Sequence, residues 1–426
     1  MDFDNLASQR VDTIFTVWTQ NLLRNPPEEL AGHLASRHCP GTPIKASRLS
    51  NGAFNVCYRV TFEKRHRVVV RFTALGRIVA RNEKVDDKVT TKEFPGQHTT
   101  IPVPKIFGHG KSVHGPYIVM SYIEANLLSR YLKDPTQDKD TLLANISIRV
   151  LRRAYHGMAG VLLELSKVES PSELSEKTSL LFQRKHFSDA ADYFEKLAQQ
   201  HFYHLEYQRN DAVADENDCR RKYIARCLFR KLSRDIASEH CNGRFRLYCD
   251  DYSPGNVLVD PSKFIVAGVI DWEFSYAAPV EFTYAAPWRL LLERPESWDP
   301  DFDQFMAIFL PRFRTFLEVL RNCETEKIKA RSLTQSQRLS IAMEQSLDTG
   351  LFWISLASRH SALFDEIHWN FIDPKFFGPF TTMEERVALL NAEERANMNA
   401  FVNMKLIQKH EATLEIHYSI DGLVDL

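Results

Sequence analysis

Two kinds of hydrophobic spacing alternate along this chain, and the alternation limits the fold more than any other feature. From residue 46 to 124, apolar residues recur at every second position in short runs such as VCYRVTF (56–62), which is typical of β-strands. From about 127 to 244 they recur at three and four positions, which is typical of amphipathic helices. A strand-rich segment follows at 245–272, and helical spacing then continues to near residue 410. The pattern predicts an α+β protein with a small mostly-β lobe before a large mostly-α lobe.

The change in spacing also predicts the domain boundaries. Residues 1–45 form an N-terminal helical extension that ends in the Pro- and Gly-containing stretch CPGTPI. The small lobe covers residues 46–124, and the large lobe covers residues 125–426.

Charge and cysteine content exclude several classes of protein. The formal net charge is -1, so no overall field attracts nucleic acid or an anionic membrane. No stretch is long and apolar enough for a membrane-spanning helix, and the first residues do not resemble a signal peptide. The seven cysteines contain no C-x-x-C pair, which argues against a disulfide framework and a zinc site. We therefore expect a cytoplasmic protein with no nucleic-acid or membrane partner.

The stretch LYCDDYSPGNVLVD (247–260) carries a pattern that suits phosphoryl transfer. Asp251 and Asn256 flank a Ser-Pro-Gly turn, and Asp271 ends the next apolar run. Phosphoryl transfer needs a carboxylate that orients the accepting hydroxyl and oxygen ligands that hold Mg²⁺. Alone, Asp251 and Asn256 could simply satisfy the backbone donors of a turn. The addition of Asp271 at a strand end favours the catalytic interpretation.

Two stretches in order resemble a known family. CDDYSPGNVLVD followed by GVIDWEFSYAAP is similar to the pattern H-x-D-x-x-x-x-N, then I-D-W-E, of the aminoglycoside phosphotransferase and choline-kinase-like family. IPVPKIFGHG and APWRLLLERPESW also resemble a fungal branch of phosphotransferase-like proteins. The resemblance runs from about Arg48 to Trp298. It implies the bilobal fold of protein kinases, with ATP and Mg²⁺ as cofactors and a hydroxyl-bearing small molecule as substrate.

The resemblance also implies roles for the polar residues of these motifs. Asp251 would be the catalytic carboxylate, and Asn256 and Asp271 would hold Mg²⁺. Arg71, in the apolar run RVVVRF, would hold the nucleotide phosphates in place of the usual lysine. Arginine keeps the positive charge but changes its geometry.

The small lobe would supply the remaining nucleotide contacts. Ser50, Asn51 and Gly52 would form the loop over the phosphates, although this loop lacks G-x-G-x-x-G. The connection from Ser121 to Glu124 would receive the adenine ring. These residues complete the implied nucleotide site.

Three departures from the family pattern bear on activity. Cys249 replaces the usual histidine and is expected to act as a small apolar group. The second departure is the small-lobe helix that carries the acidic partner of Arg71, because this helix is shorter than the family's. The candidates for that partner are Glu93 and Glu83. Arg71 itself is the third departure. They leave open a second interpretation, a degenerate, non-catalytic protein that binds nucleotide or a partner.

A protein kinase is disfavoured, because Trp272 and Glu273 follow Asp271 where D-F-G would be expected. The identity of the acceptor and the oligomeric state stay open. A polycationic acceptor would want an acidic pocket, for which the candidates are Asp250, Glu273, Glu281, Glu293 and Glu296.

Overall fold

The structure is a computed structural model of the 426-residue chain. It describes residues 5–24, 26–51, 55–74, 93–137, 141–169, 187, 189–208, 212–240, 245–293, 297 and 301–411.

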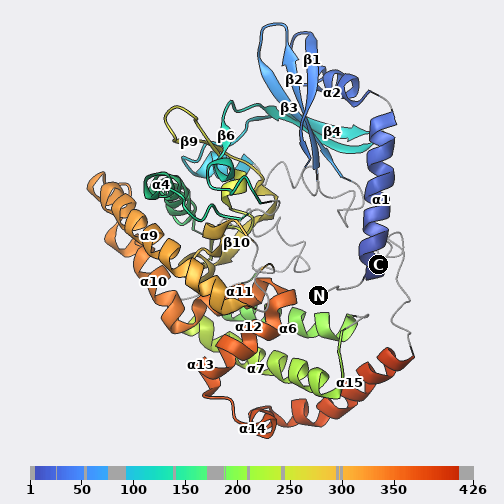
Figure 1. The fold of residues 1–426 in the computed structure, drawn as a ribbon, viewed down its shortest axis with the longest axis vertical. Coiled ribbons are helices and arrows are strands. Elements are labelled where there is room, and N and C mark those ends of the chain that lie inside the picture. Colours follow the sequence, from blue (N-terminus) through green and yellow to red (C-terminus); the bar gives the residue numbers. More distant parts are fainter. Residues whose placement is uncertain are drawn as a thin grey trace. The chain divides into compact units, whose positions relative to one another are not determined.

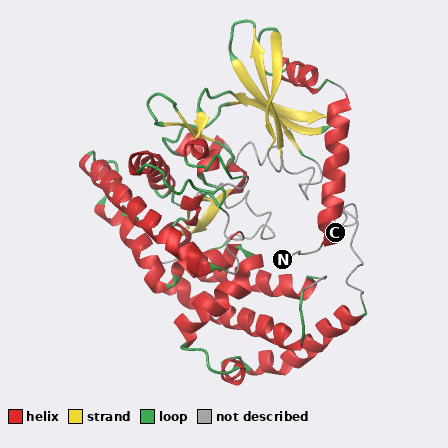
Figure 2. Ribbon diagram, in the orientation of Figure 1, coloured by secondary structure: helices red, strands yellow, loops and turns green. Residues whose placement is uncertain are grey.

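The chain divides into two compact units. The small unit contains Asp4–Asn126 and Leu258–Glu273, and the large unit contains Leu127–Val257 and Phe274–Leu414. Strands predominate in the first and helices in the second (Figure 2). The predicted order of a mostly-β region before a mostly-α region is therefore confirmed.

A five-stranded antiparallel sheet forms the centre of the small unit, in the order β1-β2-β3-β5-β4 (Figure 1). Its strands are β1 (Pro43–Asn51), β2 (Asn55–Phe62), β3 (Arg67–Thr73), β4 (Ile106–Ser112) and β5 (Gly115–Ser121). The helices that precede it are α1 (Asn5–Arg24) and α2 (Pro27–Ser36), and α2 packs on β1 and β2. Residues 93–98 are also helical.

Sequence spacing explains the burial of two strands in this sheet. In β2 the side chains of Val56, Tyr58, Val60 and Phe62 are buried, as their period of two predicts. Every residue of β3 after Arg67 is buried, because β3 is the middle strand and both of its faces are covered. The uninterrupted apolar run around Arg71 therefore reflects a central strand.

Two smaller sheets carry the polar motifs of the sequence. The first pairs β7 (Phe245–Cys249) with β10 (Ser275–Pro279) in antiparallel fashion. The second has the order β6-β8-β9, with β6 (Asn126–Leu127), β8 (Val257–Val259) and β9 (Val266–Val269).

Helices form most of the large unit. They include α4 (Ile148–Leu165), α6 (Ala190–Tyr207), α7 (Glu216–His240), α8 (Val280–Tyr284), α9 (Phe302–Lys329), α10 (Ser340–Thr349), α11 (Leu351–Arg359), α12 (Phe364–Ile367), α13 (Asp373–Phe377), α14 (Met383–Ala388) and α15 (Ala392–His410). Helix α6 packs along α7, and α4 packs against α9; Figure 1 labels these helices. Among the described residues, no helix combines the length and the apolar character that a bilayer span requires.

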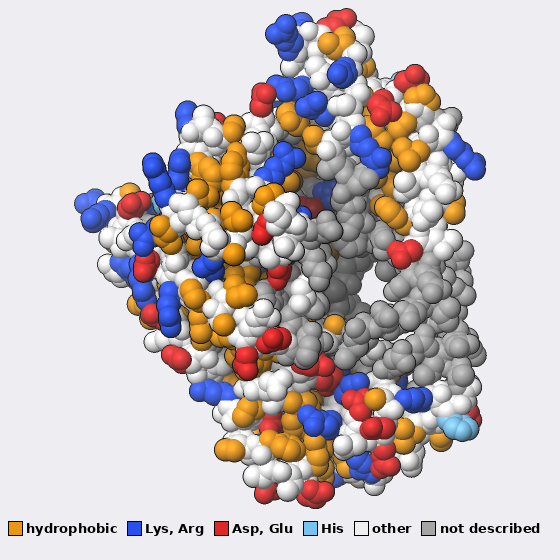
Figure 3. Space-filling view, in the orientation of Figure 1, with side chains coloured by type: hydrophobic (Ala, Val, Ile, Leu, Met, Phe, Trp, Pro, Cys, Tyr) orange, Lys and Arg blue, Asp and Glu red, His pale blue; other side chains and the backbone are white. Residues whose placement is uncertain are grey.

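Charged side chains of both signs are interspersed over the described residues of the face in Figure 3. This distribution agrees with the net charge of -1. Neither sign dominates this face of the described part.

Candidate active site

The loop after β7 brings two aspartates to the end of a buried strand. Cys249, the last residue of β7, pairs with Ser275 of β10. Asp250 and Asp251 follow at once, and the Asp250 backbone N–H donates to the Phe274 carbonyl at 3.1 Å. The 3-10 turn Pro254–Asn256 then reverses the chain into β8. The loop is thereby fixed at both ends by strands.

Asn256 folds back onto Asp251. Its Nδ2 donates to the Asp251 carboxylate Oδ2 at 2.8 Å and to the Asp251 carbonyl oxygen at 2.7 Å. The structure therefore brings together these two residues, which the sequence predicted to act in one site. With its nitrogen turned toward Asp251, the amide of Asn256 has its oxygen as the atom that can face a cation.

Arg289 pairs with the same carboxylate from a different segment. The short 3-10 helix Trp288–Leu291 carries Arg289, whose Nη1 donates to Asp251 Oδ1 at 2.9 Å. Each carboxylate oxygen of Asp251 thus accepts a hydrogen bond. Burial lowers the pKa of the Arg289 guanidinium, and the charge of Asp251 opposes that shift. The pair restricts Asp251 to one orientation.

Asp250 has a structural role instead of facing solvent freely. The Arg359 Nη1 donates to one of its carboxylate oxygens, and the Tyr276 hydroxyl donates to the other at 2.8 Å. Arg359 also donates to the Tyr248 hydroxyl at 2.6 Å. The two neighbouring aspartates are therefore each paired with a different arginine.

Cys249 is buried beneath this loop, and burial raises the pKa of its thiol to about 12. At neutral pH the thiol is protonated, so it lacks the thiolate that nucleophilic or redox chemistry needs. This agrees with the predicted role of a small apolar group.

The small unit brings together Arg71 and Asp271. The Arg71 Nη2 donates to Asp271 Oδ1 at 2.9 Å, and the exposed fractions of the two side chains are 7% and 30%. Asp271 follows β9 and has φ of 66°, in the left-handed region that few residues other than glycine adopt. Trp272 is buried next to it and donates from Nε1 to the Val269 carbonyl at 2.9 Å. These contacts hold Asp271 at the strand end with part of its carboxylate open.

The other predicted nucleotide contacts lie at strand ends or outside the described residues. Ser50 and Asn51 are the last residues of β1, and Gly52 lies outside the described residues. Ser121 ends β5, and its hydroxyl accepts a hydrogen bond from the Lys105 backbone N–H at 2.9 Å. Glu124 is exposed.

Glu124 accepts a hydrogen bond from Arg67 at 2.6 Å, which makes it part of an ion pair. Of the two candidate helix partners of Arg71, Glu93 begins the helical residues 93–98 and Glu83 lies outside the described residues. Within the described ranges, no group of three or more His, Cys, Asp or Glu side chains is arranged to hold a metal ion.

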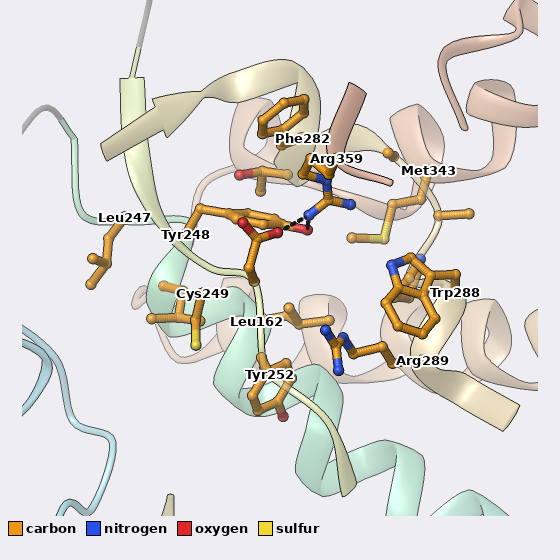
Figure 4. Close-up of a pocket in the computed structure, with 16 residues that line it drawn as sticks. Leu162, Leu247, Tyr248, Cys249, Tyr252, Phe282, Trp288, Arg289, Met343 and Arg359 are labelled. Carbon is orange, nitrogen blue, oxygen red and sulfur yellow. Dashed lines mark hydrogen bonds and ion pairs between the residues drawn. The ribbon is translucent and has the colours of Figure 1, made fainter. Parts of the chain in front are cut away.

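A small cavity adjoins the loop of the two aspartates in the large unit (Figure 4). Its volume is about 50 Å³, which suits one or two water molecules. Most of its lining is apolar or aromatic, and its charged members are Asp250, Arg289 and Arg359. The cavity reaches the groups that pair with the aspartates.

Sequence reasoning missed the roles of Arg289 and Arg359. Arg289 lies in a stretch that carries the family resemblance, and an arginine within the apolar run PWRLLL is a local signal that could have drawn attention to it. Arg359 ends helix α11, 109 residues after Asp250, so no local pattern connects the two.

A family model described as "Phosphotransferase enzyme family" matches residues 45–305, more than half of the chain. No match was found among the curated proteins.

Several solved structures are similar at low identity. An ethanolamine kinase of Plasmodium vivax is 11% identical with a TM-score of 0.44, over 78% of this chain and 81% of its own. A macrolide 2'-phosphotransferase of Brachybacterium faecium is 12% identical with a TM-score of 0.42, over 82% and 98%. An amicoumacin kinase in complex with AMP-PNP and Ca²⁺ is 14% identical with a TM-score of 0.44, over 89% and 92%.

Proposed function

Because this chain belongs to the phosphotransferase enzyme family, we propose that it transfers the γ-phosphoryl group of ATP, with Mg²⁺, to a hydroxyl group of a small molecule. The observation that carries the proposal is the pairing of Asp251 with Asn256 in the loop after β7. The overall reaction would join the hydroxyl oxygen to phosphorus, break the bond to the leaving ADP oxygen and release the hydroxyl proton.

Asp251 would orient the hydroxyl and accept its proton. A positioned carboxylate suits this task because the hydroxyl must be held in line with the transferred group. The Nδ2 of Asn256 at 2.8 Å fixes one carboxylate oxygen, and the second oxygen, which pairs with Arg289 at 2.9 Å, would act on the acceptor. Such positioning supplies much of the rate enhancement in phosphoryl transfer.

Asn256 and Asp271 would hold Mg²⁺, which neutralises phosphate charge when bound. Their chemistry fits a hard cation, which prefers carboxylate and amide oxygens and completes its shell with phosphate and water. The amide orientation of Asn256 and the partly open carboxylate of Asp271 support this assignment. Arg71, which pairs with Asp271, would place its positive charge near the nucleotide phosphates.

Residues of the small unit would complete the nucleotide site. Ser50, Asn51 and Gly52 would cover the phosphates, and the segment from Ser121 to Glu124 would receive adenine. Ser121 is the last residue of β5, so the segment after it leaves the sheet, where its remaining backbone groups would hydrogen-bond the planar base.

Conservative substitution tests the proposal. Asp251→Asn should lower ATP turnover by about 100- to 10,000-fold, the usual effect of removing a general base. Asp271→Asn should abolish Mg²⁺-dependent turnover, and asparagine also tolerates the left-handed backbone at this position. ADP release is measured by a coupled assay across a range of Mg²⁺ concentrations.

The matched control is Asp303→Asn, which changes an exposed aspartate in the first turn of α9. It should leave turnover unchanged. Thermal melting of each variant separates loss of function from unfolding, since Asp271→Asn weakens a pair with buried Arg71. Wild-type turnover in a well-folded Asp271→Asn protein would refute the metal assignment.

A second candidate is a non-catalytic protein that binds nucleotide or a partner. The contact of Arg289 with Asp251 favours it, because a guanidinium occupies the oxygen that would face the hydroxyl. Mg²⁺-dependent ATP binding without phosphoryl transfer to any acceptor, across a broad panel of hydroxyl metabolites, would support this candidate over the enzyme.

We place the protein in the cytoplasm. Five cysteines among the described residues, Cys39, Cys219, Cys227, Cys249 and Cys323, are free and buried. Free, buried thiols suit a reducing compartment.

A further inference from the structure

The loop of the proposed catalytic aspartate is balanced in charge. Asp251 pairs with Arg289, and Asp250 pairs with Arg359. Two carboxylates and two guanidinium groups therefore share this corner of the large unit. In Figure 4 the two arginine side chains reach toward the loop from different elements. A polycationic acceptor would meet no excess of negative charge there.

Two of the five acidic residues that could attract a polycation, Asp250 and Glu281, are already paired or neutral. Both oxygens of Asp250 accept hydrogen bonds. Glu281 has an exposed fraction of 0%, and burial raises its pKa to about 7, which favours the neutral acid. Glu296 lies outside the described residues, and the structure does not describe the side chain of Glu273.

Arg289 has donor capacity that its contacts do not use. Its Nε is buried and has no hydrogen-bond partner among the described residues. A buried guanidinium nitrogen without a partner is unfavourable, and an anion that accepts from it would relieve the cost. The guanidinium also lies over the Trp288 ring, with 4.2 Å between its central carbon and the ring centroid. This stacking orients the planar guanidinium group, whose paired N–H donors match two oxygens of a carboxylate or phosphate.

We propose that the acceptor carries an anionic group, a carboxylate or a phosphate, near the hydroxyl that is phosphorylated, and that Arg289 binds this group. The proposal rests on the proposed function and names its substrate class. An anion that takes the guanidinium withdraws it from Asp251 Oδ1, which lies 2.9 Å from Nη1. Asp251 Oδ1, no longer paired with this guanidinium, then accepts the hydroxyl proton as the new oxygen–phosphorus bond forms and the bond to ADP breaks. Arg289 therefore selects the acceptor and exposes the base in one movement.

The test uses acceptors that differ in one terminal group, which is a carboxylate, a hydroxymethyl group or an aminomethyl group. One set is gluconate, sorbitol and glucamine, and a shorter set is glycerate, glycerol and aminopropanediol. Binding of each compound to the full chain is measured by calorimetry without nucleotide, and phosphoryl transfer is measured with radiolabelled ATP and Mg²⁺. The expected order within at least one set is anion first, neutral alcohol second and amine last.

Arg289→Gln should weaken binding of the preferred anion by about 10- to 100-fold, the factor for one hydrogen bond to a charged group. The anion-to-neutral ratio should fall toward one. Arg152→Gln is the matched control, because Arg152 pairs with Glu318 at 2.7 Å with both side chains more than half exposed. This control should keep the wild-type ratio.

Preference for the amine, or an unchanged ratio in a folded Arg289→Gln protein, overturns the inference. Failure of every anion to bind the wild-type chain also overturns it. If Arg289→Gln does not fold, the order of the three charge classes on the wild-type chain decides alone. The chain could bind anions through Arg289 and yet consume no ATP. That result would support this inference and refute the proposed function, so the two are judged separately.

Discussion

Replacement of Arg359 by methionine tests how the loop of the two aspartates is held. Methionine keeps an unbranched side chain but removes the guanidinium. That group donates to Asp250 and, at 2.6 Å, to the Tyr248 hydroxyl. It also lies 5.0 Å from the ring centroids of both Tyr248 and Phe282. The substitution therefore removes an ion pair, a hydrogen bond and two cation–π contacts together.

The magnitude follows from burial. Breaking a fully buried ion pair costs about 3–5 kcal/mol, because one charge is left without a partner. The Asp250 side chain is 33% exposed and Arg359 10%, so water replaces part of the lost interaction. We expect Arg359→Met to lower the free energy of unfolding by about 3 kcal/mol. With an m-value of about 3 kcal/mol/M, the urea midpoint should fall by about 1 M.

The assay is urea denaturation followed by tryptophan fluorescence on four proteins: wild type, Arg359→Met, Asp250→Asn and the double variant. If the two residues act as a pair, their effects are not additive, and the coupling free energy should be about 1–2 kcal/mol. ATP turnover should also fall in Arg359→Met, because Asp250 precedes Asp251 in the loop. Additive effects, within about 0.5 kcal/mol, would refute the reasoning.

Two further predictions concern buried titrating groups. Burial raises the pKa of Glu281 from its usual 4.5 to about 7. Between these two pH values the folded chain binds more protons than the unfolded chain. The free energy of unfolding therefore falls as the pH rises through this window. Glu281→Gln should remove this pH dependence. Its free energy of unfolding, read from urea midpoints, should exceed that of wild type by about 3 kcal/mol above pH 7 and differ little below pH 4.5. Parallel pH curves for the two proteins would contradict this prediction. The second prediction concerns Cys249, whose thiol is buried and has a pKa of about 12. It should resist iodoacetamide at pH 8 in the folded chain and react in urea. The half-buried Cys57 should be modified before it. Peptide mass spectrometry reads both sites, and early modification of Cys249 would show that the loop opens.

The parts of the fold that local spacing encodes could be predicted from the sequence. The buried face of β2 was predicted from the period of two at Val56 to Phe62, because alternate side chains of a strand point to one face. The pairing of Asp251 with Asn256 was also within reach, since five residues and one turn separate them.

Contacts between distant segments were not predictable in this way. Arg289 reaches Asp251 across 38 residues, and Arg359 reaches Asp250 across 109. No periodicity specifies which acid an arginine will meet once helices have packed. Likewise, the segment Leu258–Glu273 clusters with the small unit, although the chain before and after it belongs to the large unit.

The backbone at Asp271 restricts which residues evolution or a mutagenesis library can place there. With φ at 66°, a β-branched or bulky side chain meets steric strain before its chemistry matters. Glycine, asparagine and aspartate are the residues that accept this conformation readily. A saturation library at position 271, sorted for soluble folded protein alone, should therefore be enriched in these three. Of these three residues, aspartate alone carries a negative charge. A folded variant that replaces Asp271 with one of the other two therefore loses this carboxylate.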